Sequence, residues 1–346
     1  MSYPMRMLVT GGAGFIGSHL VERLLDQGHQ VFVVDDLSTG SITNLAAVRS
    51  NPNLEVHIDS VLDKQVLAEL VDRSDLIFHL AAAVGVRRII DSPLATMKTN
   101  VHGTEMILEL SVKKGKRLLI TSTSEVYGKS EKVPYSEADD LVLGPTTHSR
   151  WSYACSKAID EFLALAYHRV SALPVSIVRL FNTTGPRQTG RYGMVIPTFV
   201  RQALRGEPVT IFGTGEQTRC FSHVSDIVEG ILMCAFKEEA AGQIFNLGST
   251  EEVTINALAE RVLEITGSRS EIRRLPYSEA YGEGFEDMFR RVPDIGKAVD
   301  WFGYRPTKSL DDILRSVHDD QRRDNRLPAP GIALARTATG AATAAI

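Results

Sequence analysis

Hydrophobic and polar residues follow two different patterns along the first half of the chain, one typical of strands and one typical of helices. Short apolar runs that are typical of buried strands lie at residues 6–10, 30–34, 54–58, 75–80, 117–121 and 175–180. Apolar residues at helical spacing lie at residues 18–27, 100–113 and 151–169. Strands that alternate with helices predict an α/β fold in which a doubly wound parallel sheet is covered on both faces.

The pattern of hydrophobic and polar residues changes after residue 182. Glycine and proline become frequent, and short strands at 210–212 and 243–247 mix with helices at 226–236 and 255–266. From about residue 322 the chain is rich in Ala, Thr, Gly and Pro, a composition with little to bury. We therefore expect three parts: a first domain over 1–182, a smaller mixed α/β lobe over 183–321 that is partly intertwined with it, and a disordered tail over 322–346.

A glycine-rich turn, Gly11-Gly-Ala-Gly-Phe-Ile-Gly17, separates the first expected strand from the first expected helix. Gly12, Gly14 and Gly17 fit G-x-G-x-x-G, whereas Gly11, Gly14 and Gly17 fit G-x-x-G-x-x-G, and the spacing does not choose between them. Either version allows a tight turn and a close approach of the backbone to a pyrophosphate, which then lies at the helix N-terminus. The turn predicts that the first domain is a Rossmann-type domain that binds a dinucleotide.

An acidic pair indicates which dinucleotide this is. The second expected strand ends in Asp35-Asp36, and Asp35 follows Gly17 by 18 residues, near the spacing of about 20 for an acid that binds the adenosine ribose. A carboxylate there repels a 2′-phosphate, which favours NAD over NADP. The candidate cofactor contacts are Gly11, Gly14, Phe15, Ile16, Gly17, Asp35, Asp36, Leu80, Ala81, Ala82 and Asn100, with Asp59 as a candidate adenine contact.

The bulk composition excludes several classes of partner. The 346 residues carry a net charge of −4, which predicts neither a nucleic-acid nor a membrane partner. No apolar run is long enough to span a bilayer, and the N-terminus lacks a signal-peptide pattern. Three cysteines without a C-x-x-C pair indicate a cytoplasmic protein without structural disulfides. The histidines show no ligand spacing, so we expect no metal site.

A tyrosine and a lysine four residues apart, Tyr153 and Lys157, are the candidate catalytic pair. On a helix their side chains share one face, and an ammonium beside a phenol favours the phenolate. Lys157 can also hold the ribose of the nicotinamide. Thr123 or Ser124, at the end of the preceding strand, can bind a substrate hydroxyl and direct it to Tyr153.

Charged residues near these positions are candidates for handling the substrate. Glu125 follows Ser124 directly, and a carboxylate there can donate or accept a proton at a carbon next to a ketone. Arg219 is a candidate to hold a phosphate or a substrate carboxylate, and Arg187 is a second candidate of the same kind. Cys155 lies on another face of the helix, so we interpret it as a packing residue.

These motifs together resemble those of the extended short-chain dehydrogenases that act on nucleotide sugars. The resemblance covers roughly residues 5 to 315 and rests on Thr10 to Gly17, His79-Leu-Ala-Ala82, Ser122 to Gly128, Tyr153-x-x-x-Lys157, Arg179 to Thr183 with Gly185-Pro186, and Arg291-Val-Pro-Asp294. It implies that bound NAD oxidises the sugar 4-hydroxyl and that the resulting 4-keto sugar epimerises, loses water or loses carbon dioxide.

The closest resemblance is to UDP-glucuronate decarboxylases and UDP-apiose/xylose synthases, on Thr123-Ser-Glu125, Arg150 to Lys157 and Gln217 to Phe221. It implies a UDP-linked sugar as substrate, with Glu125 assisting at the sugar ring, Arg219 holding the substrate and Asn182 contacting the phosphates. The loops at 83–88 and 185–192 depart from the decarboxylase pattern. Glu125 alone therefore does not separate UDP-glucuronate decarboxylation from 4-epimerisation of UDP-glucuronate or UDP-glucose, or from 4,6-dehydration.

Two further expectations concern the whole molecule. The resemblance implies a homodimer that pairs through the helices expected at 100–113 and 151–169. The alternative to an enzyme is an NAD-binding regulator on the same fold, since fold does not fix function. Because this chain keeps Tyr153, Lys157 and a Ser/Thr partner, the sequence favours an enzyme.

Overall fold

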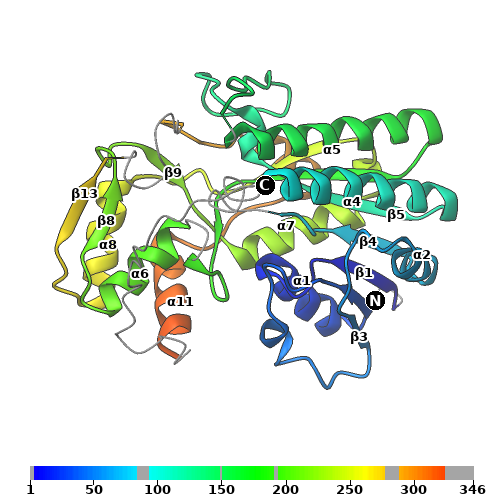
Figure 1. Ribbon diagram of the computed structural model, residues 1–346, viewed down its shortest axis with the longest axis horizontal. Helices are drawn as coiled ribbons and strands as arrows, with labels where there is room; N and C mark the ends of the chain where they lie inside the picture. Colours follow the sequence, from blue (N-terminus) through cyan, green and yellow to red (C-terminus); the bar gives the residue numbers. More distant parts are fainter. Residues whose placement is uncertain (1–3, 84–92, 149, 191–193, 277–287, 324–346) are drawn as a thin grey trace, which may run out of the picture.

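A computed structural model describes residues 4–83, 93–148, 150–190, 194–276 and 288–323 (Figure 1). The tail expected over 322–346 lies outside the described residues from 324 onward. Figure 1 shows a larger lobe that contains the N-terminal half of the chain beside a smaller lobe built from later segments.

A parallel sheet of seven strands forms the centre of the larger lobe, in the order β11-β6-β5-β4-β1-β2-β3. Its strands are β1 (Arg6–Thr10), β2 (Gln30–Val34), β3 (Leu54–His57), β4 (Leu76–His79), β5 (Arg117–Thr123), β6 (Val175–Leu180) and β11 (Ile244–Leu247). The chain runs outward from β1 to β3, then crosses to β4 on the other side of β1. Ligands of such sheets bind where the strand order reverses, at the carboxyl ends of the strands.

Helices cover both faces of this sheet, which confirms the predicted doubly wound fold (Figure 1). On one face lie α1 (Phe15–Asp26), α7 (Val224–Phe236) and α10 (Gly296–Phe302), and on the other α2 (Lys64–Arg73), α4 (Pro93–Lys114) and α5 (Arg150–Ser171). The alternation of side chains along β1 explains the two layers, because Met7 and Val9 pack in one core and Leu8 in the other. All three side chains are fully buried.

Among its described residues, the smaller lobe combines three helices with short strand pairs around its own core. Its helices are α6 (Val195–Leu204), α8 (Ile255–Thr266) and α11 (Leu310–Arg323). The pairs are β8 (Val209–Phe212) with β13 (Ile272–Leu275), β9 (Thr218–Cys220) with β12 (Glu252–Thr254), and β7 (Thr183–Thr184) with β10 (Ser222–His223). Between these segments the chain returns to the larger lobe as α7 and β11.

The part of the chain that the structure describes also contains three short 3-10 helices: η1 (Ile42–Leu45), η2 (Ser124–Tyr127) and η4 (Glu238–Ala240). Several boundaries differ from those expected from the sequence. The strand expected to end at residue 121 runs on to Thr123, and the helix expected from residue 100 already begins at Pro93. The strand expected to include Ile58 ends at His57, and Ile58 is 63% exposed.

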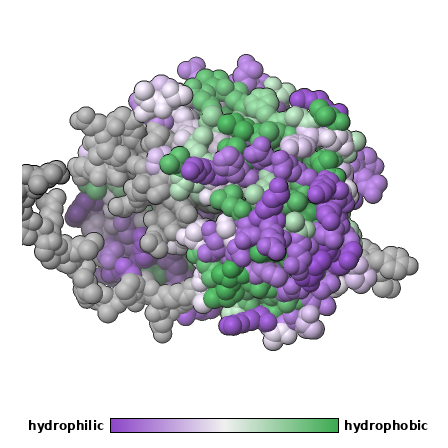
Figure 2. All heavy atoms as spheres, turned by 45° about the vertical axis from the view of Figure 1, so that its right-hand side comes forward, coloured by the Kyte–Doolittle hydropathy of each residue, from purple (hydrophilic) through white to green (hydrophobic). Residues whose placement is uncertain are grey.

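Hydrophobic side chains are exposed on the long helices of the larger lobe. Leu94 on α4 is 67% exposed, and Phe162 and Val170 on α5 are 65% and 85% exposed. Figure 2 shows hydrophobic surface gathered in the upper part of the face on which these helices lie. None of the helices that the structure describes is long and apolar enough to cross a membrane.

Candidate functional site

The glycine-rich turn joins β1 to α1 with a backbone that leaves no room for side chains. Gly11 has φ +73°, and a Cβ built on it would lie 2.9 Å from the Ala81 backbone nitrogen at the end of β4. A Cβ on Gly14 would lie 3.0 Å from the Gly11 carbonyl oxygen, and one on Gly17 would collide with that same oxygen. A Cβ on Gly12 would in turn lie 2.7 Å from Cγ1 of Val33 on β2. Side chains are therefore excluded at all four glycines, and the geometry is compatible with both versions of the motif.

A pocket opens directly at this turn, over the point where the strand order reverses. It is lined by Gly11, Gly14, Phe15, Ile16, Gly17, Val34, Asp35, Asp36, Ser38, Thr39, Val61, Leu80, Ala81, Ala82, Ala83, Thr99 and Thr121. Helix α1 starts at Phe15 without a side-chain cap, so backbone N–H groups of its first turn remain available to bind an anionic group. The close-packed glycines and this helix end fit the pyrophosphate of NAD.

Asp35 lies at the carboxyl end of β2, where it lines the pocket and supports the turn. Its Oδ2 accepts a hydrogen bond from the Ala13 amide at 2.9 Å, and its Oδ1 accepts one from the Leu37 amide at 2.8 Å. Burial raises the pKa of Asp35, while these amides act in the opposite direction. Asp36 also lines the pocket but is exposed. Each carboxylate oxygen has capacity for a further donor, as a ribose hydroxyl would supply.

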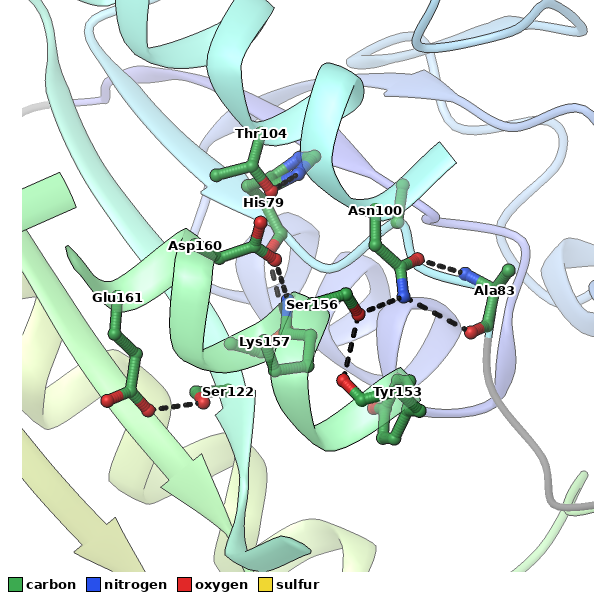
Figure 3. A network of polar contacts seen from close by, with 12 residues as sticks. His79, Ala83, Asn100, Thr104, Ser122, Tyr153, Ser156, Lys157, Asp160 and Glu161 are labelled. Carbon is green, nitrogen blue, oxygen red and sulfur yellow. Dashed lines mark hydrogen bonds and ion pairs between the residues drawn. The ribbon is translucent and has the colours of Figure 1, made fainter. Parts of the chain in front are cut away.

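Four predicted cofactor contacts do not line this pocket: Asn100, Asp59, Tyr153 and Lys157. Asn100 is buried on α4, where its Oδ1 accepts from the Ala83 amide at 2.8 Å and its Nδ2 donates to the Ser156 hydroxyl of α5 at 3.0 Å (Figure 3). Its neighbour Thr99 lines the pocket instead. Asp59 accepts a hydrogen bond from the Ser60 amide, and the pocket wall nearby is Val61. Asn100 thus joins the wall of the pocket to the helix that carries the catalytic pair.

The carboxyl end of β5 places the predicted substrate-handling residues on the turn into η2. Thr123 caps η2, with its hydroxyl accepting a hydrogen bond from the Glu125 amide at 3.2 Å. Ser124 is buried at 1% exposure, whereas the Glu125 side chain is 18% exposed. Thr123 and Glu125 are therefore brought together on one short turn.

Tyr153 lies beside this turn on α5 and is only 7% exposed. Burial raises its pKa, the negative charges of Glu125 and Asp160 raise it further, and a hydrogen bond with Thr123 opposes them. The expectation that Lys157 lowers the pKa of this phenol is therefore not met by the protein residues alone. The physical reason is that the Lys157 ammonium lies 2.8 Å from the Asp160 carboxylate, which compensates its charge.

A buried arginine that the sequence analysis quoted in a motif, but did not assign to the site, lies beside Glu125. The Arg291 Nη1 lies 3.9 Å from Glu125 Oε1 and 3.5 Å from Asn182 Oδ1. Asn182 also donates a hydrogen bond to the Cys220 carbonyl oxygen at 2.9 Å, across to β9. Arg291 therefore gathers the predicted residues Glu125 and Asn182 around one cation. Its position 138 residues after Tyr153 hid this proximity from the sequence.

The other two predicted arginines have different surroundings. Arg219 is 8% exposed on β9, and its Nη1 donates to the Thr218 carbonyl at 2.7 Å. Arg187 pairs instead with α1: its Nη2 lies 2.6 Å from Glu22, and its backbone amide donates to Asp320 of α11. The guanidinium of Arg187 is thus engaged in joining the two lobes, and the structure does not bring it to the catalytic turn as a substrate contact.

Within the described residues, no group of three or more His, Cys, Asp or Glu side chains could hold a metal ion. The groups that the structure brings to the carboxyl edge of the sheet are the dinucleotide pocket, the tyrosine–lysine pair, and the Glu125 and Arg291 side chains.

Comparison with known proteins places this geometry in context. Residues 8–317 match the family model described as GDP-mannose 4,6 dehydratase. The chain is 42% identical to the UDP-N-acetyl-alpha-D-glucosaminuronate decarboxylase of Bacillus cytotoxicus, over 90% of this chain and 96% of that protein. It is 40% identical to UDP-glucuronic acid decarboxylase 4 of Arabidopsis thaliana, over 93% of this chain and 71% of that protein. The solved UDP-glucuronic acid 4-epimerase of Bacillus cereus, in complex with UDP-glucuronic acid and NAD, is 28% identical with a TM-score of 0.83, over 92% of this chain and 99% of that one.

Proposed function

This chain belongs to the family of NAD-dependent nucleotide-sugar enzymes that the GDP-mannose 4,6 dehydratase model describes, and we propose that it removes carbon dioxide from a UDP-linked uronic acid. The predicted family, the enzyme class and the dependence on NAD are confirmed by this membership. The product of the proposed reaction is the corresponding UDP-linked pentose.

The observation that carries this proposal is the pairing of Glu125 with Arg291 next to Tyr153. A guanidinium with a side-chain exposure of 7% is a strong partner for a carboxylate, because its charge is poorly screened by water. In a uronic acid the carboxylate carbon, C6, is bonded to C5, which is the neighbour of C4. If the C4 hydroxyl lies at Tyr153, the carboxylate is within the neighbourhood of Arg291.

The proposed reaction balances as follows. Tyr153, held by Thr123, accepts the proton of the 4-hydroxyl as the hydride leaves C4. The C4 ketone is β to the C6 carboxylate, so the C5–C6 bond breaks, carbon dioxide leaves and the electron pair moves into the enolate. Glu125, whose side chain is 18% exposed, is assigned to take up a proton from solvent and deliver it to C5, so the net reaction consumes one proton for each carbon dioxide released. The hydride returns to C4, and Tyr153 gives back the proton that it took.

NAD, when bound, supplies the hydride acceptor. The Gly11–Gly17 turn and the first turn of α1 would hold the pyrophosphate, and Asp35 would hold the ribose of the adenosine. Lys157 is proposed to hold the ribose of the nicotinamide. Arg219 and Asn182 are proposed to hold the UDP phosphates.

Two sugars fit this proposal. UDP-glucuronate is the substrate that the sequence predicts and that names the Arabidopsis relative. UDP-N-acetylglucosaminuronate is favoured by the name of the Bacillus cytotoxicus relative, at 42% identity. Both carry the same carboxylate at C5 and differ at C2, so both enter the same reaction scheme.

The test is incubation of the purified protein with each sugar, followed by mass spectrometry of the product. Loss of carbon dioxide from either sugar supports the proposal and identifies the substrate. An unchanged mass with an inverted C4 centre would assign a 4-epimerase, loss of water a dehydratase, and no change with either sugar would favour the NAD-binding regulator.

A substitution at Glu125 separates the oxidation at C4 from the later steps at C5 and C6. Glu125→Gln should reduce formation of the UDP-linked pentose by about 100-fold, the size of a typical proton-transfer contribution, while NADH absorbance still develops from C4 oxidation. Glu69→Gln, on the exposed surface of α2, is the matched control and should behave as wild type. Equal loss of both signals in Glu125→Gln would argue against the assigned role.

A further inference from the structure

A short loop after β7, residues 185–188, connects the two lobes and takes no part in the proposed reaction scheme. It lies between α1 of the larger lobe and α11 of the smaller lobe. The backbone amide of Arg187 donates a hydrogen bond to Asp320 Oδ2 of α11 at 2.9 Å, and the guanidinium of the same residue contacts α1. Arg187 therefore contacts both lobes at once.

Three residues on neighbouring turns of α1 contact this loop. Glu22 Oε1 lies 2.6 Å from Arg187 Nη2, and the Ser18 hydroxyl accepts a hydrogen bond from Arg187 Nη1 at 3.2 Å. His19 Nε2 lies 3.1 Å from the Pro186 carbonyl oxygen, and because a carbonyl oxygen can only accept, this nitrogen carries the hydrogen. We call Arg187 with its partners Ser18, Glu22 and Asp320 the inter-lobe clamp.

The α1 side of the clamp follows directly on the glycine turn that would hold the pyrophosphate of NAD. Ser18 is the next residue after Gly17, and its hydroxyl donates a hydrogen bond to the Phe15 carbonyl oxygen at 3.1 Å. Gly17 and Phe15 both line the dinucleotide pocket. A displacement of this part of α1 would therefore move the cofactor with it.

The other side of the clamp leads to the residues that are proposed to hold the UDP phosphates. Asn182 directly precedes β7, and its carbonyl oxygen accepts a hydrogen bond from the Ser222 amide of β10 at 3.2 Å. Arg219 lies on β9, the strand before β10. Gln188 holds the loop to β7, because its Nε2 donates to the Thr183 carbonyl oxygen at 2.8 Å. The loop is therefore fixed to the substrate side of the site.

The backbone of Arg187 lies in the left-handed region, with φ +69°. A glycine adopts this conformation more easily than an arginine does. A side chain at such a position persists only where its surroundings determine the conformation. The contacts of the guanidinium with Ser18 and Glu22 supply a reason for a long cationic side chain here. The side chains of Arg187 and Glu22 are 22% and 23% exposed, so water screens their attraction only in part.

We propose that Arg187 is a positioning residue that holds α1 and the smaller lobe at a fixed separation, so that C4 of the sugar meets the nicotinamide at the distance that hydride transfer requires. Such distances are critical, since a misplacement of about 1 Å can lower a rate by about 100-fold. This inference rests on the proposed function only in taking oxidation of the sugar by NAD as the first step. It does not depend on the fate of the 4-keto intermediate.

The test is Arg187→Met, which keeps a long side chain but removes the charge and the hydrogen-bond donors. The dinucleotide pocket lies in the larger lobe and Arg219 in the smaller one, so each ligand keeps its own contacts. The NAD content and the dissociation constant for UDP should therefore stay as in wild type, while kcat with UDP-glucuronate or UDP-N-acetylglucosaminuronate should fall by about tenfold or more. Wild-type kcat, or a matching loss of affinity for NAD or UDP, would overturn the proposal.

The matched control is Arg23→Met, which removes an ion pair of the same kind from the same helix. Arg23 Nε lies 2.6 Å from Glu229 Oε1 of α7, so this pair stays within the larger lobe. Arg23→Met should leave kcat unchanged, and a loss equal to that of Arg187→Met would count against a role between the lobes.

Two further variants test the ion pair itself. Arg187→Glu places two carboxylates together and should lower kcat, whereas Arg187→Glu combined with Glu22→Arg restores the pair in reverse and should recover most of that loss. Failure of the double variant to recover would contradict the clamp. If Arg187→Met does not fold, Glu22→Ala takes its place, because it removes the same pair and leaves the loop unaltered. It should lower kcat by about tenfold, and wild-type kcat in Glu22→Ala would overturn the proposal.

Hydrogen exchange without any sugar separates this inference from the proposed function. Amide hydrogens of residues 183–190 should exchange about tenfold faster in Arg187→Met than in wild type, because the loop opens more often, and Arg23→Met should not change them. Faster exchange without conversion of either sugar would support the clamp and refute the decarboxylase. Decarboxylation with unchanged exchange and unchanged kcat in Arg187→Met would do the reverse.

Discussion

At the scale of single residues, burial changes the chemistry of the catalytic pair. The sequence alone predicts a phenol whose pKa is lowered by a lysine one helical turn away. In the structure, desolvation of Tyr153 is the larger effect, and Asp160 compensates the lysine. A tyrosine in this setting rests as a neutral phenol. The positive charge of oxidised NAD, when bound nearby, would favour the phenolate that can accept a proton.

Tyr153→Phe tests this role directly. The substitution keeps the ring and removes the proton acceptor, so turnover should fall by about 100- to 10,000-fold while NAD remains bound. Activity on the nucleotide sugar and the NAD content of the purified protein are the two measurements. Tyr127→Phe is the matched control, because the Tyr127 hydroxyl bonds Asn246 away from the reaction and burial raises its pKa to about 12. Wild-type turnover in Tyr153→Phe would refute the assignment.

Asp35 is predicted to select NAD. Asp35→Ala removes the carboxylate that faces the ribose, so NAD affinity should fall by about tenfold or more, and rejection of NADP should relax. Titration of both cofactors by calorimetry or fluorescence measures the ratio. Because Asp35 also accepts from the Ala13 amide, a thermal unfolding curve must show that the turn still folds. A wild-type protein that already prefers NADP would contradict this reading.

At the scale of elements, local patterns were predicted well and long-range neighbours were not. The glycine turn between β1 and α1 follows from a few adjacent residues, since only glycine fits beside the Ala81 backbone and the Gly11 carbonyl. Arg291 is different, because its contact with Glu125 depends on how a distant segment folds back over β5. For the same reason, the sequence could not show that Glu22 and Asp320 occupy Arg187.

The catalytic helix also shows what spacing can and cannot predict. The i, i+4 spacing of Tyr153 and Lys157 places them on one face, as expected. The same rule extended by one turn reaches Asp160, but spacing gives no sign that this carboxylate is fully buried. Burial arises because α4 packs along α5, with Thr104 and His79 closing the far side.

At the scale of the whole molecule, the chain order alone does not define the two lobes. The sequence predicts a change of architecture after residue 182, and the β8–β13 pair with α6, α8 and α11 does form a separate core. However, α7 packs against α1, and β11 pairs with β6, so the later segment completes the seven-stranded sheet. The site draws on both parts, with Glu125 and Tyr153 from one and Arg291 from the other.

The last prediction is a homodimer formed through α4 and α5. These helices pack against each other, and each carries an exposed apolar side chain, Leu94 on α4 and Phe162 on α5. An exposed apolar face of this kind is more often an interface than bare surface.

Light scattering at micromolar concentration should give twice the 38.0 kDa chain mass, and Phe162→Arg should shift the protein toward one chain mass without unfolding it. Ile58→Arg, at an equally exposed apolar position beyond β3, is the matched control and should remain dimeric. A wild-type monomer under these conditions would refute the prediction, and it would leave the α4–α5 face without the partner that its apolar side chains predict.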